Sequence, residues 1–227
     1  MKQKFTILFD LDGTLVDTAP DLMLAHNHVM KKFGYPTKST EDIRNLVGKG
    51  AGALIGRSIW GQAKKEFSKV LDEKIKDEMV KEFINFYGKN INNESTLVTG
   101  VKSFLIWCKE QNISMAVCTN KQEHLSNDLL KKIGIYDFFE YVAGSDTFDY
   151  CKPDPRHLTN VVEILDGDVK KTIMIGDSET DANAAKAAEI PVILLENGYT
   201  EKNTTEIYHN HLIKDFIGIE KIITKYL

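Results

Sequence analysis

A short apolar run that ends in two aspartates places the strongest constraint on the fold of this chain. Residues 5–9 read Phe-Thr-Ile-Leu-Phe, and Asp10, Asp12 and Gly13 follow. Such a run is typical of a central strand in a parallel sheet, whose ligand sites lie at the carboxyl ends of the strands. The two-residue period of an extended chain directs both carboxylates to one side, and Gly13 allows an immediate turn. Carboxylates this close indicate a metal, proton transfer or covalent chemistry; a plain strand with an Asp-Gly turn is the alternative.

Helical and extended patterns alternate from Gly100 onward, which is typical of a parallel sheet with crossover helices. We therefore expect an α/β fold with the run at 5–9 as a central strand. Further strands are expected at 113–118, 138–143, 172–175, 190–195 and 211–213, with a helix capped by Asp154 after Lys152 and a closing helix within 216–226.

The segment between the first strand and this alternating region has helical spacing and no convincing strand. Thr18, Pro20 and Asp21 predict a helix start, with Thr18 as the cap and Asp21 as an acid in the first turn, and Gly34 predicts the helix end. Amphipathic spacing continues at Ile43, Leu46, Val47, Phe67, Leu71, Met79 and Phe83, and residues 89–95 read as a return linker. We therefore expect a core of residues 1–16 and 92–227 and an inserted helical cap of residues 17–91.

Composition limits the classes of partner. The 227 residues carry a net charge of −4 and are 42% hydrophobic, so a sizeable core is expected and nothing favours nucleic acid or an anionic membrane surface. The first apolar run is too short for a signal peptide or a membrane span, and the three cysteines form no Cys-x-x-Cys pattern. We expect a cytoplasmic protein with reduced thiols, and an anionic substrate would need local cations; the oligomeric state is not predicted.

Other polar residues follow predicted strands at similar positions. Thr119, Lys152 and Asp177 lie at or just beyond strand ends, where Asp10 and Asp12 also lie. Carboxylates, a hydroxyl and a lysine are the inventory that phosphoryl transfer requires. Taken singly, Thr119 could cap a helix, Lys152 could be a solvated lysine and Asp177 a loop acid. Ser178 and Asp181 fit a helix capping box, and Asp181 could serve both the helix and the site.

Taken together and in order, these residues resemble the motifs of the haloacid dehalogenase-like hydrolases: Asp10-x-Asp12-Gly-Thr-Leu, Thr119-Asn, Lys152-Pro and Gly176-Asp177-Ser-x-x-Asp181. The resemblance implies a Rossmann-like core with an inserted small α-helical cap. Asp-x-Asp resembles the phosphatase form of the family. The segments that begin at Asp17 (Asp-Thr-Ala-Pro-Asp-Leu) and at Val47 (Val-Gly-Lys-Gly-Ala) resemble its phosphoglycolate phosphatases, although Lys49 stands where asparagine is common.

The resemblance also implies the role of each motif residue. Asp10 would attack phosphorus to form an aspartyl phosphate, and Asp12 would protonate the leaving alkoxide and then activate water. Mg²⁺ would be held by Asp10, the Asp12 carbonyl and Asp177. The remaining roles would be phosphoryl binding by Thr119 and the Asn120 amide, charge compensation by Lys152, and support of these groups by Ser178 and Asp181.

The cap would read the leaving group, because the core motifs handle the phosphoryl group and the metal. Arg44, Lys49 and Arg57 fall in the segment that resembles the specificity loop of the family, and a carboxylate would suit them, with Lys49 the first choice. The expected substrate is 2-phosphoglycolate, a small anionic metabolite. The alternatives are a hexose-phosphate phosphatase, a sugar-phosphate mutase or a pyrophosphatase, and, outside enzymes, a phospho-aspartate signalling receiver.

Overall fold

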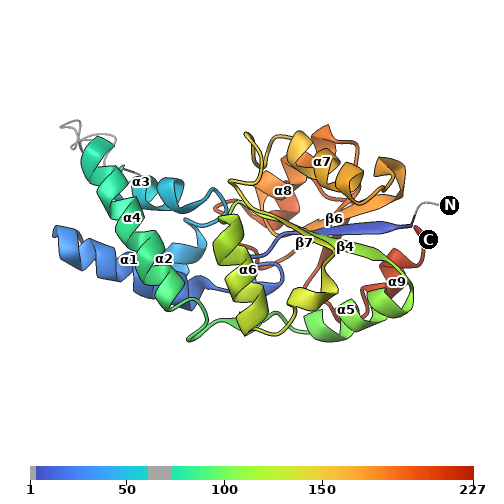
Figure 1. Cartoon of the computed structure of the whole chain (residues 1–227), viewed down its shortest axis with the longest axis horizontal. Helices are drawn as coiled ribbons and strands as arrows, with labels where there is room; N and C mark the ends of the chain where they lie inside the picture. Colours follow the sequence, from blue (N-terminus) through green and yellow to red (C-terminus); the bar gives the residue numbers. More distant parts are fainter. Residues whose placement is uncertain (1–3, 61–72) are drawn as a thin grey trace.

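The computed structural model describes residues 4–60 and 73–227, so the expected helical positions Phe67 and Leu71 lie outside the described residues. Its centre is a six-stranded sheet in the order β5-β4-β1-β6-β7-β8, in which every pair of neighbours is parallel (Figure 1). The strands are β1 (Thr6–Phe9), β4 (Ser114–Cys118), β5 (Tyr141–Ala143), β6 (Thr172–Gly176), β7 (Val192–Leu195) and β8 (His211–Ile213). The predicted α/β fold with residues 5–9 at its centre is confirmed.

The register of the three middle strands brings their carboxyl ends level. Phe9 of β1 lies opposite Val117 of β4 and Ile175 of β6. The residues that follow each strand therefore emerge side by side at one edge of the sheet. This register positions the site described below.

Apolar helices cover both faces of the sheet, as the continuous burial of β1 requires. Ile7 and Phe9 pack in a core that includes residues of α5 (Val101–Glu110), α6 (Glu123–Lys132) and α9 (Glu220–Ile223). Leu8 points to the other face, in a core with α7 (Arg156–Ile164) and α8 (Glu179–Ala187). Figure 1 shows these two groups of helices below and above the sheet.

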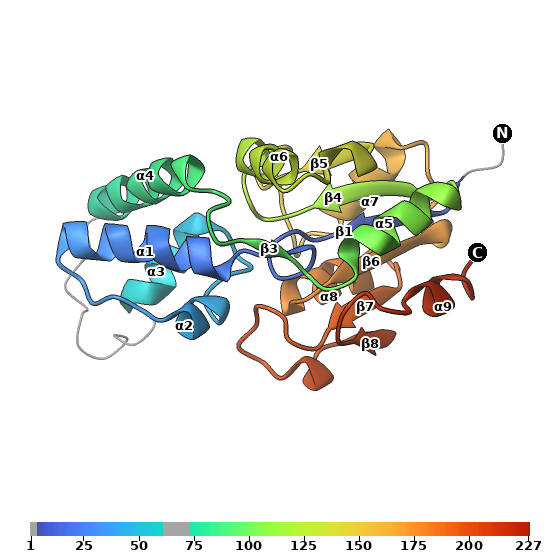
Figure 2. The same ribbon diagram turned by 90° about the horizontal axis from the view of Figure 1, so that it is seen from below.

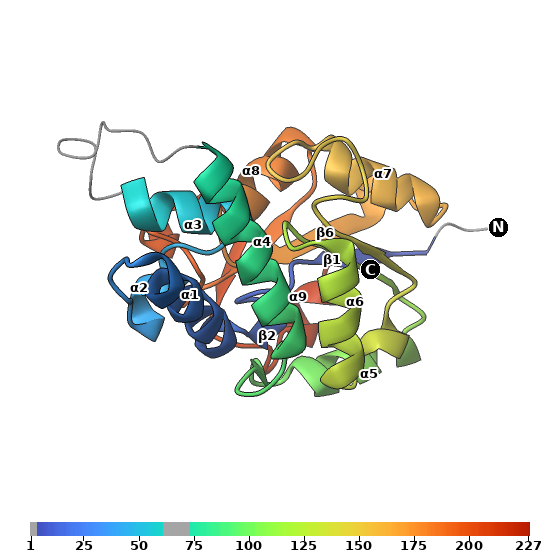
Figure 3. The ribbon, with the colours of Figure 1, turned by 60° about the vertical axis from the view of Figure 1, so that its left-hand side comes forward.

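Four helices form a separate layer at the carboxyl edge of the sheet: α1 (Ala19–Phe33), α2 (Thr40–Arg44), α3 (Ala51–Trp60) and α4 (Glu73–Lys89). Figures 2 and 3 show α1 and α4 side by side at this end of the molecule. Ile43, Met79 and Phe83 are buried there, as their helical spacing predicts. No helix in residues 4–60 and 73–227 is both long enough and apolar enough to cross a membrane.

A two-stranded ribbon carries the chain to and from these helices. β2 (Val16–Asp17) pairs antiparallel with β3 (Thr96–Leu97). The carboxylate of Asp21 accepts bonds of 2.6–3.1 Å from the backbone N–H groups of Glu94 and Ser95 and from the Ser95 hydroxyl. The division into a core of 1–16 and 92–227 and a cap of 17–91 stays a proposal, which this paired crossing supports.

Helix α1 follows Thr18, carries Asp21 in its first turn and ends at Gly34, as predicted, but neither the Thr18 nor the Asp21 side chain caps the helix. Thr18 precedes the helix, but its hydroxyl caps no helical N–H and instead donates to Asp12 Oδ1 at 2.8 Å. The Asp21 carboxylate binds residues 94–95, which lead into β3, and not the N–H groups of the helix. Thr18 is oriented by the neighbouring Asp12 carboxylate, whereas the partners of Asp21 lie 73 and 74 residues away and only the fold brings them close.

Smaller differences concern the edges of the fold. The expected strand at 138–143 is a 3₁₀ turn, η1 (Tyr136–Phe138), followed by the three residues of β5. The helix expected within 216–226 is regular only over Glu220–Ile223. Further 3₁₀ turns are η2 (Val169–Lys171) and η3 (Thr204–Glu206). Helix α7 begins one residue later than expected, with Pro155 and not Asp154 at the cap position; the Asp154 carboxylate still accepts from the Arg156 N–H at 2.9 Å.

Candidate active site

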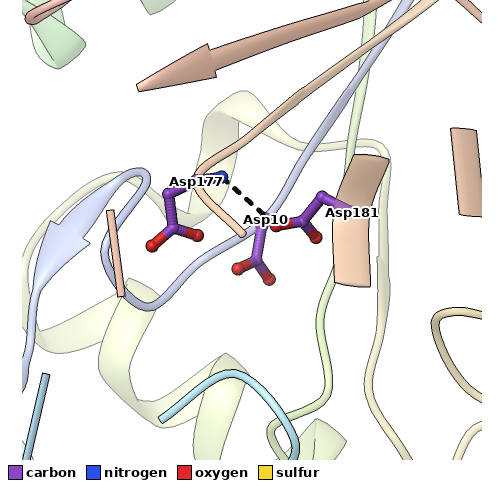
Figure 4. A group of neighbouring side chains, drawn as sticks. All are labelled: Asp10, Asp177 and Asp181. Carbon is purple, nitrogen blue, oxygen red and sulfur yellow. Dashed lines mark hydrogen bonds between the residues drawn. The ribbon is translucent and has the colours of Figure 1, made fainter. Parts of the chain in front are cut away.

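Three carboxylates converge where β1 and β6 end. Asp10 follows β1, Asp177 follows β6, and Asp181 lies in the first turn of α8. One oxygen of each carboxylate lies within 4.8 Å of those of the other two, and all three residues are buried. Figure 4 shows the three side chains gathered together, with the backbone N–H of Asp177 directed at Asp181.

Lys152 links two of these carboxylates from the loop before α7. Its Nζ donates to Asp10 Oδ1 at 2.8 Å and to Asp181 Oδ1 at 2.6 Å, and its side chain is almost completely buried. Asp10 Oδ2 accepts no hydrogen bond from the described residues. One oxygen of Asp10 is therefore fixed by an ammonium group, and the other remains for chemistry.

Asp181 supports the site from α8. Its Oδ2 accepts from the backbone N–H groups of Asp177 and Ser178 and from the Ser178 hydroxyl, at 2.7–3.2 Å. Its Oδ1 accepts from Lys152. Both expected roles of Asp181 are thus present in the structure: it closes the capping box and it orients the lysine beside Asp10.

Asp177 is held in a closely fitting cradle. Thr14 Oγ1 donates to its Oδ1 at 3.1 Å, and the Tyr199 N–H donates to its Oδ2 at 2.6 Å. Gly13 has φ of 84°, and a Cβ at that position would lie 2.2 Å from Asp177 Oδ2. Gly13 is therefore required both for the turn and for the space that this carboxylate fills.

Burial dominates the electrostatics of this cluster. Burial raises the pKa of Asp10 to about 6, against the opposing effect of the Lys152 ammonium. Burial and the neighbouring Asp10 also raise the pKa of Asp177 well above its ordinary value. Lys152 would have a lowered pKa from burial alone, but Asp10 and Asp181 raise it overall. The carboxylates are thus costly to ionise without a further cation.

His157 lies behind Lys152. Its Nδ1 accepts from the Lys152 backbone N–H at 3.3 Å. Burial and the repulsion of Lys152 lower the pKa of His157 to about 4. The imidazole is therefore neutral at pH 7 and adds no charge to the site.

The donor set of the cluster fits a hard divalent cation. All the candidate ligand atoms are carboxylate oxygens, which Mg²⁺ prefers. When all four are ionised, the carboxylates of residues 10, 12, 177 and 181 carry four negative charges, and the ammonium groups of residues 121 and 152 carry two positive ones. The net charge of the site is then −2, which a divalent cation would neutralise. Asp181 is already saturated, because its Oδ2 accepts three hydrogen bonds and its Oδ1 is engaged by the Lys152 ammonium. Each oxygen of Asp177 accepts only one bond, and only one oxygen of Asp10 is engaged, so these two carboxylates are better placed to accept a metal.

Asp12 is bound by a lysine of its own. Lys121 Nζ lies 2.7 Å from Oδ1 and 2.8 Å from Oδ2 of Asp12, and both side chains are largely buried. The ammonium also lies 4.5 Å from the ring centroid of Tyr87, at the end of α4. Sequence reasoning missed Lys121; its position directly after Thr119-Asn120 was the available signal.

Thr119 and Asn120 lie at the end of β4 and connect the core to the cap. Both residues are buried, and both line the same cavity as Asp10 and Asp12. Asn120 Nδ2 donates to the Lys152 carbonyl at 2.9 Å and to the Gly48 carbonyl of the cap at 3.1 Å. Gly50, with φ of 82°, lies so close to Asn120 that a Cβ would be 3.2 Å from its carbonyl oxygen.

The cavity over Asp10 lies between core and cap. It has a volume of about 50 Å³. Because one water needs roughly 10–15 Å³ by this measure, the cavity has room for only a few non-hydrogen atoms. Its walls are the polar groups at the strand ends and, from the cap and α6, a mainly apolar set: Leu22, Val47, Gly48, Gly50, Ala51, Leu54, Phe83, Ile84 and Leu125.

The three cap cations expected to act together do not line this cavity. Arg44 donates to Asp17 Oδ2 at 2.6 Å and lies over the Tyr199 ring. Arg57 donates to two backbone carbonyls of residues 45–46 and pairs with Glu201. Lys49 is exposed and shares a neighbouring groove with Arg57. Both arginines thus have partners that hold the cap loop in place, and the expected cluster is not assembled in this arrangement.

Tyr199 is a second residue that sequence reasoning missed. Its N–H holds Asp177, while its hydroxyl accepts from the Ala19 N–H at 2.8 Å and donates to Asp17. It therefore connects the acidic cluster with the first crossing to the cap. No local pattern signals this role, because the residue lies in an irregular loop after β7.

The similarity of this chain to known proteins shows the class to which it belongs. A family model described as haloacid dehalogenase-like hydrolase matches residues 7–195, and the chain belongs to this family. A phosphoglycolate phosphatase of Mesorhizobium japonicum is 37% identical over 210 residues, covering 92% of this chain and 90% of that protein. One of Caulobacter vibrioides is 38% identical over 216 residues, covering 95% and 89%.

A solved structure shows the same fold. The crystal structure of a predicted phosphoglycolate phosphatase from Haemophilus somnus superposes with a TM-score of 0.89 at 32% identity, covering 98% of this chain and 99% of that one. The expected family and the expected enzyme class, a phosphatase, are confirmed by these similarities.

Proposed function

We propose that the protein is a Mg²⁺-dependent phosphatase that hydrolyses 2-phosphoglycolate through an aspartyl-phosphate intermediate. One observation carries the proposal: Asp10 and Asp12 line one small cavity, yet each carboxylate is held by a different lysine. Two neighbouring carboxylates in different environments are suited to two different tasks.

Asp10 is the proposed nucleophile. Oδ2 attacks phosphorus while Lys152 holds Oδ1, and the bond from phosphorus to the glycolate oxygen breaks. The electron pair leaves with that oxygen, which takes the proton that Asp12 carries as a carboxylic acid when the ester binds; Asp12 is then a carboxylate. In the second step water attacks the phosphorus atom, Asp12 takes the proton of the water, and inorganic phosphate leaves Asp10. Thr119 and the Asn120 N–H bind the phosphoryl oxygens at the end of β4.

Asp10, Asp177 and the Asp12 carbonyl would hold the metal. When bound, Mg²⁺ neutralises charge on the phosphoryl oxygens. The residues of this chain contribute the rest: Thr14 and the Tyr199 N–H fix Asp177, and Asp181 fixes Lys152.

The size of the cavity supports a small leaving group. The two carbons and three oxygens of glycolate match a space of about 50 Å³ better than a hexose does. The relatives named phosphoglycolate phosphatase at 37–38% identity support the same substrate. We also propose a cytoplasmic location, with which the free thiols of Cys108, Cys118 and Cys151 agree.

Steady-state assays of the purified protein on a panel of phosphate esters test the proposal. With Mg²⁺, phosphoglycolate should give a higher kcat/KM than glucose 6-phosphate, β-glucose 1-phosphate and pyrophosphate. A higher value for any of these would reject the proposed substrate and favour the corresponding alternative within the family. Stoichiometric phosphorylation without turnover would instead indicate a signalling receiver.

A further inference from the structure

Lys121 is the single cation among the described residues that line the cavity over Asp10. Lys152 does not line it, because that lysine is buried behind Asp10 and engaged with two carboxylates. Around Lys121 the walls are mainly apolar and include Leu54, Phe83 and Leu125. An anionic leaving group placed among such walls needs a charge partner, because an unpaired carboxylate is costly to bury.

The Lys121 side chain is held in a fixed position. Two of its N–H groups are directed at the two oxygens of Asp12, and the Tyr87 ring lies against the ammonium on the cap side. An ammonium has three donors, and beyond the two oxygens of Asp12 the described residues offer the third only the face of the Tyr87 ring, with no oxygen or nitrogen acceptor. A buried ammonium whose third donor has only a ring as a partner can donate to a second anion beside Asp12.

We propose that Lys121 is a specificity-determining residue that binds the carboxylate of the leaving group. This inference rests on the proposed function, since it explains how that same site recognises a phosphorylated hydroxy acid. In such an ester a single carbon separates the carboxylate from the oxygen that Asp12 protonates. One ammonium that touches both Asp12 and the carboxylate therefore aligns the acid with the leaving oxygen. Esters without the carboxylate lose this alignment.

Binding of two matched phosphonates tests the proposal without turnover. 3-Phosphonopropionate carries the carboxylate, and propylphosphonate has a methyl group in its place. With Mg²⁺ present, calorimetry on the wild-type protein should show at least about tenfold tighter binding of 3-phosphonopropionate, the effect of one charged hydrogen bond. Lys121→Met should reduce this ratio to about twofold or less, and Lys121→Arg should restore part of it.

Kinetic ratios provide a second measurement. The ratio of kcat/KM for phosphoglycolate to that for 2-hydroxyethyl phosphate should fall in Lys121→Met by about the same factor as the binding ratio. Lys132→Met, an exposed lysine at the end of α6, is the matched control and should keep both ratios. Thermal unfolding of each variant establishes that it is folded.

The outcomes separate this inference from the proposed function. If the wild-type protein shows no preference for the carboxylate ligand, the proposed substrate is wrong. If the wild-type protein has that preference and Lys121→Met keeps it, the assignment of Lys121 is overturned while the proposed function stands. The same holds if Lys121→Met weakens the binding of both phosphonates by the same factor. Loss of the preference in Lys49→Ala but not in Lys121→Met would also overturn it and assign recognition to the cap loop.

Discussion

The side chain of Asn120, at the end of β4, donates to the Gly48 carbonyl of the cap at 3.1 Å. The same amide nitrogen donates to the Lys152 carbonyl at 2.9 Å. One buried amide therefore connects the cap loop with two motifs of the core. The nitrogen of the Asn120 side-chain amide, and not its oxygen, faces both carbonyls, because a carbonyl oxygen can only accept a hydrogen bond.

Asn120→Ala is expected to loosen the loop at 45–50. Loss of two buried hydrogen bonds should lower kcat/KM by about tenfold or more, since each contributes roughly 1 kcal/mol. Limited proteolysis within that loop should become faster, and a mass spectrum of the fragments locates the cut. If neither the proteolysis rate nor kcat/KM changes, the amide does not connect cap and core in solution.

Asp10→Asn is expected to abolish turnover, because it removes the nucleophile. The loss should reach about four orders of magnitude or more in kcat, with the folded structure retained by circular dichroism. Asp154→Asn is the matched control, since that carboxylate pairs with Arg156 on the surface. Residual turnover well above this level, in protein free of contaminating phosphatase, would contradict the role of Asp10.

Asp12→Asn is expected to slow both steps of the reaction. The loss on phosphoglycolate should be about 10²- to 10⁴-fold, the usual contribution of a positioned acid or base. 4-Nitrophenyl phosphate should lose less in the first step, because its leaving group needs no proton; burst kinetics resolve that step. Wild-type rates on both substrates would make Asp12 a structural acid.

A divalent metal should stabilise the folded protein as well as activate it. Mg²⁺ at a hundred times its Kd adds about 2.7 kcal/mol to the free energy of unfolding, visible as a higher Tm. Asp177→Asn should reduce this rise, while chelated wild-type protein should be inactive and recover with Mg²⁺. Full activity after exhaustive chelation would contradict the metal site.

Stability should fall in acid through His157. Its pKa is lowered to about 4 by burial and by Lys152, from an ordinary value of 6.5. Between these values the unfolded chain binds more protons than the folded one, so stability is complete above pH 6.5 and is lost as pH falls toward 4, by up to about 3 kcal/mol. Asp10 has the opposite effect: its raised pKa favours the folded state at low pH, and that contribution is lost as pH rises through about 6.

Denaturant unfolding of His157→Asn measures this contribution. Asn keeps an acceptor near the position of Nδ1 and has no charge change in this range. The difference in unfolding free energy between wild type and variant should shrink as pH falls from 7 to 4, with the effect of Asp10 common to both. A difference independent of pH would show that His157 does not titrate as described.

The sequence predicted the sheet and the core motifs because both depend on local patterns. The apolar runs of β1, β4 and β6 each end directly before a polar residue, and parallel strands bring such ends together without further information. Asp10 therefore lies beside Asp177 and lines the same cavity as Thr119, as expected.

Contacts between distant segments could not be predicted in this way. Lys121 has the same local pattern as a solvated lysine, and only the fold places it against Asp12, 109 positions away. The local pattern around Asp21 fits an acid in the first turn of a helix. Only the fold shows that its carboxylate accepts from three donors of the returning chain. The sequence predicted that Arg44 and Arg57 bind the leaving group, but in the folded chain they pair with Asp17 and Glu201.

The ribbon of β2 and β3 has a consequence for how such enzymes diversify. Because Val16 and Leu97 are paired neighbours, the core chain leaves and re-enters at almost the same point. An insertion between adjacent ends disturbs the host fold little, so segments of very different length can be exchanged there. A recombination event at this one junction would replace the helices that contact the leaving group and leave the strand ends that carry Asp10 and Asp177 in the same sheet.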